Sequence, residues 1–445
     1  MDSFELLKQD LNSCTDHIKK TRTLKISLIV NLIYVIFTIL FFFLVPLIIP
    51  IENTIIANVF KIFYQSAQTI VSNPEQLYSL PDYNMPFRYL PLFSLLFIPY
   101  TLIPYELAFV IHTVLLGLVQ TASFYLIYII STQFYKIKYD SKVKSDLLFV
   151  CLMAPLQVPM ILMGQISHIF IFLILTVIFL IENVRTKRYG IKYDYFVVGL
   201  ILGLSISFKP FSILIVPLLT KLVIKFKDKK IKIQFNFLIQ LVSGLIVSHL
   251  INAFYFFLYP SLFFEFLDIN STTQLLNYPS SSIIRIISFL FNSFSIEPIV
   301  MLILTIILYG LLFSFFLMTP SNKINYPAYF GMVILIIMIN FTDSWFLNFL
   351  IYFMLIFPGL FKFEDEVIMI RSQSLKRKLK ISNYIIYKII YYSIVYFTVG
   401  IVLGITIFPT DPILPIFLII LYVNTLWRLF RISKFASENF LSKSV

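Results

Sequence analysis

Hydrophobic runs of roughly 20 residues recur along this sequence from Leu24 to Phe430, and polar or basic stretches separate them. Strict alternation of apolar and polar residues is absent, so a membrane β-barrel does not fit. In lipid, a helix satisfies its own backbone hydrogen bonds. The pattern therefore predicts an all-α polytopic membrane protein. Thirteen apolar segments stand out, at approximately 26–50, 88–104, 105–132, 147–163, 166–182, 195–208, 209–222, 234–258, 298–318, 326–341, 346–362, 384–408 and 412–430.

The distribution of charge orients these segments. Of the 35 lysines and arginines, all but Lys61, Arg88, Lys209 and Arg285 lie in segments that can share one side of the membrane. Basic loops stay on the cytoplasmic side, and placing all of them there requires an even number of crossings. Thirteen segments therefore predict about twelve transmembrane helices and one piece that does not cross. The best candidate for that piece is 88–104 or its junction with 105–132, because prolines interrupt the helix there.

This topology predicts a single integral membrane domain over residues 1–445, most simply in the cell membrane. The ends at 1–25 and 431–445 are cytoplasmic, and the polar loops at 51–87 and 259–283 are extracytoplasmic. The net charge of +13 is explained by the positive-inside signal and by contact with membrane lipids, so we do not expect nucleic acid as a partner. With two cysteines and no cluster of Cys and His, we expect no metal and no other cofactor.

Two apolar segments, 195–208 and 209–222, are too short to span a membrane as straight helices. Each is about 21 Å long as a helix, against a hydrocarbon core of about 30 Å. They meet at Lys209, which Pro210 follows. A lysine at this depth is costly unless it faces water, a cavity or an anion. Broken helices with a charge at the break often line a binding site.

Polar residues at two other places are candidates for substrate binding. Arg88 and Tyr89 close the first extracytoplasmic loop, where they are either an interfacial anchor or a clamp for phosphate oxygens. Gln165 and His168 lie in the short link between two apolar segments. Their alternatives are a tight turn and a satisfied core histidine, but polar groups this close to the bilayer are functional candidates.

The later loops offer a second set of candidates. Asn277, Ser280 and Arg285 combine an amide, a hydroxyl and one of the few extracytoplasmic cations. Arg285 lies near the start of a short helical piece, where its charge opposes the helix dipole and favours a nearby anion. Asp343 and Trp345 fit either a loop acid with an interfacial aromatic residue or a platform for a sugar.

These residues, in this order, resemble glycosyltransferase family 87 (GT87). The resemblance rests on Phe60 to Ala67, Leu77-Tyr78, Phe87 to Pro91 with Pro99, Gly164-Gln165, Gly199 to Lys209, Asn277 to Arg285, and Ser344-Trp345. It covers roughly residues 30–360. It implies a GT-C-like bundle that transfers a hexose such as mannose, with inversion, on the extracytoplasmic face. The implied partners are a polyprenyl-phosphate sugar donor and a lipid-linked or glycan acceptor.

The sequence departs from the family at the presumed general base. The family usually has an Asp where this chain has Val59. Because inverting transfer needs a carboxylate to take the acceptor proton, we assign that role to Asp82, with Glu75 and Glu52 in the same loop as reserves.

The remaining candidates divide between the donor phosphate and the sugar or acceptor. Binding of the donor phosphate is assigned to Arg88, Lys209 and Arg285. Positioning of the sugar or acceptor is assigned to Tyr89, Gln165, Asn277 and Trp345. His168, Ser280 and Asp343 are further candidates for substrate binding. Three alternatives stay open: a transporter, a lipid flippase, and a relative that has lost activity.

Overall fold

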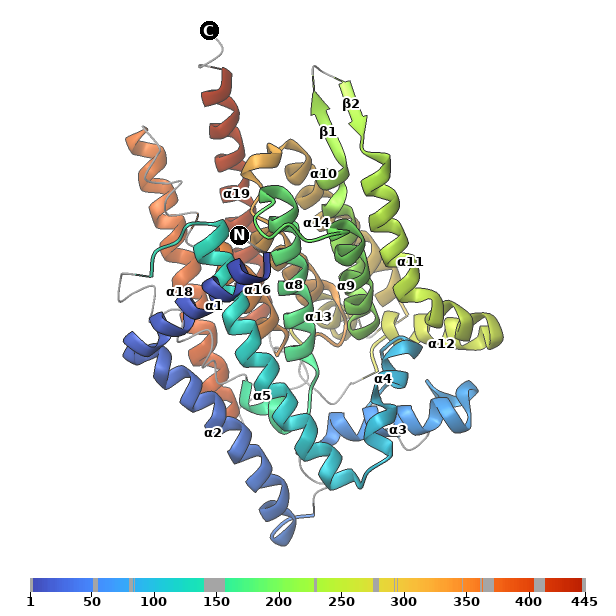
Figure 1. Ribbon diagram of the computed structural model, residues 1–445. Helices are drawn as coiled ribbons and strands as arrows, with labels where there is room; N and C mark the ends of the chain where they lie inside the picture. The colour runs from blue at the N-terminus through green and yellow to red at the C-terminus, as the bar shows by residue number, and fades with distance from the viewer. Residues whose placement is uncertain are drawn as a thin grey trace. The chain divides into compact units, whose positions relative to one another are not determined.

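A computed structural model gives the structure of the chain (Figure 1). It describes residues 3–50, 55–79, 83, 85–139, 157–227, 230–274, 280–291, 293, 295–345, 347–360, 362, 372–403 and 413–441. Helices dominate these residues, so the predicted all-α membrane class is confirmed. Besides the helices named below, the chain forms η1 (Val45–Leu47), η3 (Pro74–Gln76), η4 (Ile130–Phe134), α7 (Gln157–Leu162), α10 (Thr220–Val223) and η6 (Ser321–Lys323).

Six helices among the described residues are long and apolar enough to cross a membrane. They are α2 (Arg22–Leu44), α5 (Tyr105–Ile129), α8 (Ser167–Thr186), α11 (Phe235–Leu258), α14 (Glu297–Met318) and α19 (Ile413–Leu441). Shorter apolar helices are α4 (Pro91–Thr101), α9 (Asp194–Phe208), α15 (Tyr326–Asn340) and α16 (Asn348–Leu360). The chain is therefore an integral membrane protein, and the total of about twelve crossings stays a prediction.

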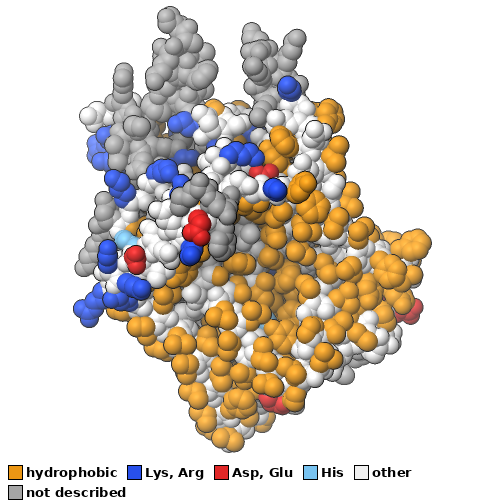
Figure 2. All heavy atoms as spheres, viewed as in Figure 1, with side chains coloured by type: hydrophobic (Ala, Val, Ile, Leu, Met, Phe, Trp, Pro, Cys, Tyr) orange, Lys and Arg blue, Asp and Glu red, His pale blue; other side chains and the backbone are white. Residues whose placement is uncertain are grey.

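Apolar side chains face outward on several of these helices. In the most apolar stretch of α14, 11% of the residues are buried, and in α11 the share is 22%. Figure 2 shows hydrophobic side chains over much of the drawn face, and Lys and Arg side chains around the N-terminal helix α1 (Ser3–Lys20). An apolar surface of this extent is stable in lipid rather than in water.

The contacts divide the chain into two compact units. The first unit is Met1–Ile213 with Leu222–Asn270, and the second is Leu214–Lys221 with Ser271–Val445. The break at Lys209 is present as predicted, because α9 ends at Phe208. The segment after the break begins as a 3₁₀ helix, η5 (Pro210–Leu219).

Helices α9 and α11 pack closely in the first unit because small residues face each other. Gly199 and Gly203 form a Gly-x-x-x-Gly pair on α9, and Gly244 and Ser248 take the same spacing on α11. A Cβ atom on Gly199 would lie 2.1 Å from the Leu241 carbonyl oxygen. Backbones approach this closely only where side chains are small. The packing holds the end of α9, and hence Lys209, beside α11.

The predicted first loop is partly helical. It contains α3 (Asn58–Ser72), which packs on α4 through aromatic rings, with the Phe63 and Phe93 centroids 4.9 Å apart. The basic linker before α11 forms a hairpin of β1 (Ile224–Lys227) and β2 (Lys230–Ile233), in which Ile224 pairs with Ile233. Its alternating apolar and basic residues suit a short antiparallel pair. Helix α12 (Pro260–Ser271) follows α11 after Tyr259.

The second unit has α15 at its centre, and every residue of this helix is buried. Helices α14, α16 and α19 pack against it, and α18 (Gln373–Leu403) packs against α19. The short helix α13 (Ile283–Leu290) also contacts α14 and α15. A helix that is hydrophobic all round belongs in an interior, so α15 anchors this unit.

Candidate active site

An apolar core residue stands where the resemblance implies an acid. Val59 lies in the first turn of α3 and is 5% exposed. Its neighbour Phe60 is fully buried and stacks on His112, with ring centroids 4.9 Å apart. The surroundings of Val59 therefore suit a hydrocarbon side chain, and this position supplies no carboxylate.

The turn that holds Gln165 is fixed beneath the start of α3. The backbone amide of Phe60 donates a hydrogen bond to the Met163 carbonyl over 3.0 Å. Gly164 has a φ of +68°, and a Cβ atom there would lie 2.6 Å from the Phe60 Cβ. The ring of His112 hydrogen bonds the Gly164 carbonyl oxygen through Nε2 over 3.0 Å. A glycine is required by both the backbone conformation and the space, and the tight turn orients Gln165.

Lys209, immediately after α9, lies beside the Tyr89 ring and near a second cation, Arg88. Lys209 stands in an extended conformation after the helix, and its Nζ lies 5.9 Å from the centre of the Tyr89 ring. The charges of Lys209 and Arg88 are close enough to repel each other. The Tyr89 hydroxyl lies beside the Gln165 side chain. The structure thus brings together four of the residues that the sequence nominated, from three separate segments.

Asn252 fixes this arrangement, and the sequence reasoning missed it. Its Oδ1 accepts a hydrogen bond from the Leu92 amide over 2.7 Å, and its Nδ2 donates to the Ser207 hydroxyl over 2.9 Å. The Leu90 amide also donates to the Ser207 carbonyl over 3.3 Å. The start of α4 is therefore attached to both α9 and α11. A buried Asn within the apolar run 234–258 was the signal that could have identified it.

Helix α12 borders the Arg88–Tyr89–Lys209 cluster. Arg88 donates a hydrogen bond through Nη1 to the Ile269 carbonyl over 2.5 Å. The Tyr78 hydroxyl donates to the Tyr89 carbonyl over 2.8 Å. Glu265 lies one turn before Ile269 on α12, and its charge acts on the Tyr78 hydroxyl. The sequence reasoning gave it no role.

His168 and Gln165 carry buried polar atoms that find no hydrogen-bond partner within the described ranges. His168, in the first turn of α8, is fully buried, and neither ring nitrogen is hydrogen bonded there. The side-chain amide oxygen of Gln165 is also buried without a hydrogen-bond partner among the described residues. Buried polar groups usually have partners, so these atoms are available to water or to substrate hydroxyls. Their role in substrate binding stays a prediction.

The second unit holds its own polar cluster. Arg285 is fully buried and forms an ion pair with Asp343. Ser280 donates to the Thr342 carbonyl over 2.7 Å, and Trp345 follows as a half-buried residue. Asp343 therefore offsets the charge of Arg285, whose assignment to the donor phosphate stays a prediction. Asn277 lies outside the described residues.

Of the three predicted base candidates, the structure describes one. Glu75 is exposed in η3. Asp82 and Glu52 lie outside the described residues. Their assignment to proton abstraction stays a prediction.

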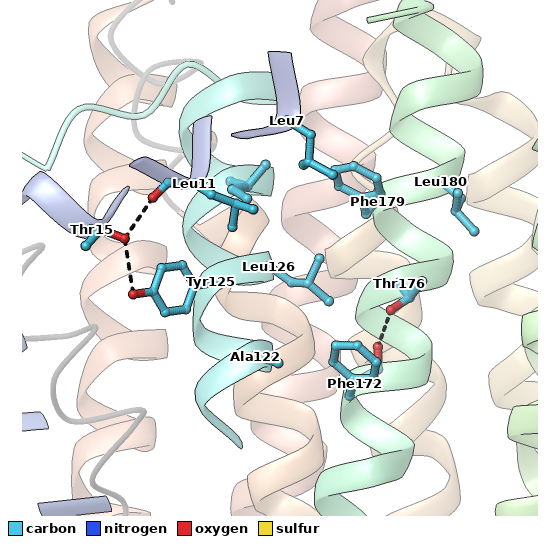
Figure 3. A pocket seen from close by; sticks show the side chains of 11 residues that line it. Leu7, Leu11, Thr15, Ala122, Tyr125, Leu126, Phe172, Thr176, Phe179 and Leu180 are labelled. Atoms are coloured by element: carbon cyan, nitrogen blue, oxygen red, sulfur yellow. Dashed lines mark hydrogen bonds between the residues drawn. The ribbon is translucent and has the colours of Figure 1, made fainter. Parts of the chain in front are cut away.

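The protein also has an apolar pocket of about 550 Å³ between α1, α5 and α8 (Figure 3). Leucine and phenylalanine side chains supply much of its wall. The Thr15 and Tyr125 hydroxyls, 3.4 Å apart, lie at one edge. No residue nominated from the sequence lines it. Its lining lacks carboxylates and cations, so it does not suit group transfer.

Comparison with known proteins gives one family. A family model described as glycosyltransferase family 87 matches residues 87–342, which is more than half of the chain. The match begins at Phe87, immediately before Arg88 and Tyr89, and it includes Gln165 and Lys209. No curated protein matches the chain significantly.

Proposed function

We propose, because the chain belongs to glycosyltransferase family 87, that it moves a hexose such as mannose from a polyprenyl-phosphate donor to a lipid-linked or glycan acceptor. Membership makes the protein a glycosyltransferase in a membrane. The donor, the acceptor, the inverting stereochemistry, the GT-C-like bundle and the extracytoplasmic face belong to the proposal. A donor with a lipid tail suits an integral membrane protein, because the tail can stay in the bilayer while the phosphate reaches the protein.

The pairing of Arg88 and Lys209 around Tyr89 carries the proposal. Two like charges close together at the end of an apolar helix make a positive site that attracts an anion. A phosphodiester oxygen supplies such an anion. Arg88 binds phosphate oxygens through its planar fork, and Lys209 adds a point charge.

The same two cations favour the chemical step. Negative charge builds on the phosphate oxygen as the bond to the sugar breaks, and fixed cations stabilise that charge in the transition state. Tyr89, Gln165 and His168 offer a ring face and buried polar atoms for the sugar. The substrate-binding roles of Asn277, Ser280, Arg285, Asp343 and Trp345 stay predictions from the sequence.

Purified protein in lipid nanodiscs, supplied with polyprenyl-phosphate hexoses and lipid acceptors, tests this function. We expect a glycosylated lipid product. Lys209→Met should raise the donor KM by about 10- to 100-fold, because a hydrogen bond to a charged group contributes about 1.5–3 kcal/mol. The matched control is Lys61→Met on α3, which removes a cation outside the cluster and should leave the KM unchanged. No product with any donor, or equal KM changes in both variants, would contradict the proposal.

A lipid flippase is the second candidate, because α9 breaks at a lysine near the membrane. The same nanodisc samples distinguish the two functions. A flippase moves a fluorescent polyprenyl phosphate between leaflets of a proteoliposome without forming a glycosidic bond. A transferase forms the bond whether or not the lipid changes leaflet.

A further inference from the structure

Helix α12 turns one face toward the Arg88–Tyr89–Lys209 cluster. Leu262 is fully buried and Phe266 is 9% exposed, so the side of α12 that carries them faces the protein. Phe266 packs on Tyr78, with ring centroids 5.9 Å apart. Glu265 lies three residues after Leu262 and four before Ile269, so it shares this face. Ile269 accepts the hydrogen bond from Arg88.

Glu265 is linked to the backbone of Tyr89 through Tyr78. Its charge acts on the Tyr78 hydroxyl, which in turn donates a hydrogen bond to the Tyr89 carbonyl over 2.8 Å. Arg88 and Tyr78 therefore both connect α12 to the short segment that carries the cluster. These links join residues about 180 positions apart in the chain, and both ends belong to the first unit.

One carboxylate oxygen of Glu265 has no hydrogen-bond donor among the described residues. Its Oε2 is buried and makes no hydrogen bond within the part of the chain that the structure describes. The residue as a whole is only partly buried. A carboxylate held in this way costs free energy unless a donor approaches it. A hydroxyl group of an incoming acceptor is such a donor, and the partial exposure leaves it a route.

We propose that Glu265 is the general base that deprotonates the acceptor hydroxyl, in the place of the acid that Val59 replaces. The assignment rests on the proposed transferase function and adds a residue to it. Glu265 comes from a different element than Asp82, Glu75 and Glu52, and α12 joins it to the cations that hold the donor phosphate.

The step balances as a single displacement. The acceptor oxygen forms a bond to the anomeric carbon of the donor sugar while its proton passes to the Glu265 carboxylate. The bond between the anomeric carbon and the phosphate oxygen breaks, and its electron pair stays on the polyprenyl phosphate. Arg88 and Lys209 stabilise that leaving group. Attack from the face opposite the phosphate inverts the anomeric centre.

Glu265→Gln tests the assignment, because glutamine keeps the size of the side chain and removes its basicity. We expect kcat for sugar transfer to fall by roughly 10²- to 10⁴-fold, the usual contribution of a general base. Binding of the donor, measured separately with a fluorescent polyprenyl-phosphate hexose, should change less than about threefold, because the cations remain. The matched control is Glu106→Gln, an exposed acid in the first turn of α5, which should keep full activity.

Two further variants keep the test decisive. Glu265→Asp retains a carboxylate and should recover part of the lost kcat, whereas a purely structural role would leave both variants alike. Asp82→Asn tests whether Asp82, the base candidate from the sequence, takes the acceptor proton instead. If Glu265→Gln transfers sugar at the wild-type rate, or if Asp82→Asn alone abolishes transfer, the Glu265 assignment is wrong while the transferase function stands. If wild type transfers no sugar, the function itself fails.

Discussion

Burial raises the pKa of the Glu265 carboxyl above its usual range. A general base must be ionised to accept a proton, so the rate of transfer falls as the pH drops through that pKa. We therefore expect the acidic limb of the kcat profile to lie at higher pH than an exposed glutamate would give. A profile of kcat against pH, measured with saturating donor and acceptor, checks this.

The neighbouring groups do not account for the acidic limb of the kcat profile, so we assign that limb to the Glu265 carboxylate. Arg88 stays charged at any working pH. Burial raises the pKa of Tyr78 well above its ordinary value, and the charge of Glu265 raises it further, so Tyr78 stays protonated. Asp268, on the same helix, is exposed. The residual activity of Glu265→Gln should be flat over the acidic range, and an unchanged acidic limb in that variant would assign the titration elsewhere.

At the scale of single residues, the sequence identifies charged groups that stand within apolar segments. Lys209 at the junction of two apolar segments is such a group, and the structure places it beside Tyr89. Glu265 gave no comparable signal, because an acid in a polar loop is ordinary. Its importance comes from α12 packing on a segment far away in the chain, and one sequence without relatives does not specify such long-range contacts.

At the scale of elements, the contact between α9 and α11 determines where Lys209 lies. A Cβ atom on Gly244 would stand 2.2 Å from the Phe196 carbonyl oxygen, so even a methyl group separates the helices. We expect Gly244→Ala to destabilise the protein by about 1–3 kcal/mol, despite the better helix propensity of alanine. The thermal unfolding temperature in detergent, with the donor KM as a second readout, measures this.

Gly310 on α14 supplies the control for that substitution. A Cβ atom there would meet nothing within 4 Å, so Gly310→Ala should be neutral or more stable by up to about 1 kcal/mol. The opposite sign of the two changes separates helix packing from helix propensity. Equal unfolding temperatures for both variants would show that the close approach of α9 and α11 is unimportant for stability.

The sequence predicts elements where the pattern is local. The helix over 195–208 and its end before Lys209 follow from apolar length and from Pro210, and the structure has α9 ending at Phe208. The 3₁₀ form of η5 has no such local signal. Helix α3 lies in a segment that the sequence predicts as a loop, although Phe60, Phe63 and Ala67 lie at helical spacing on its buried face. The many polar residues of this segment make the apolar spacing of α3 hard to recognise in the sequence.

At the scale of the whole molecule, the distribution of lysines and arginines predicts which loops lie on the cytoplasmic side. The proposed chemistry depends on this orientation, since the first loop and the Arg88–Tyr89–Lys209 cluster must meet a donor on the other face. The six long apolar helices agree with a membrane protein, and neither they nor the family match fixes its direction. Orientation is set during insertion by loop charge, so it has to be measured in the membrane.

Labelling of single cysteines measures the orientation. In a protein whose Cys14 and Cys151 are replaced by serine, a cysteine at exposed Gln76 should react with a membrane-impermeant maleimide on intact cells. Cysteines at exposed Lys232 and Lys378 should react only after the membrane is permeabilised, because both lie in basic segments. Labelling of Gln76 only after permeabilisation would put the first loop in the cytoplasm. The donor phosphate would then have to be bound on the cytoplasmic face, and the proposed extracytoplasmic transfer would be wrong.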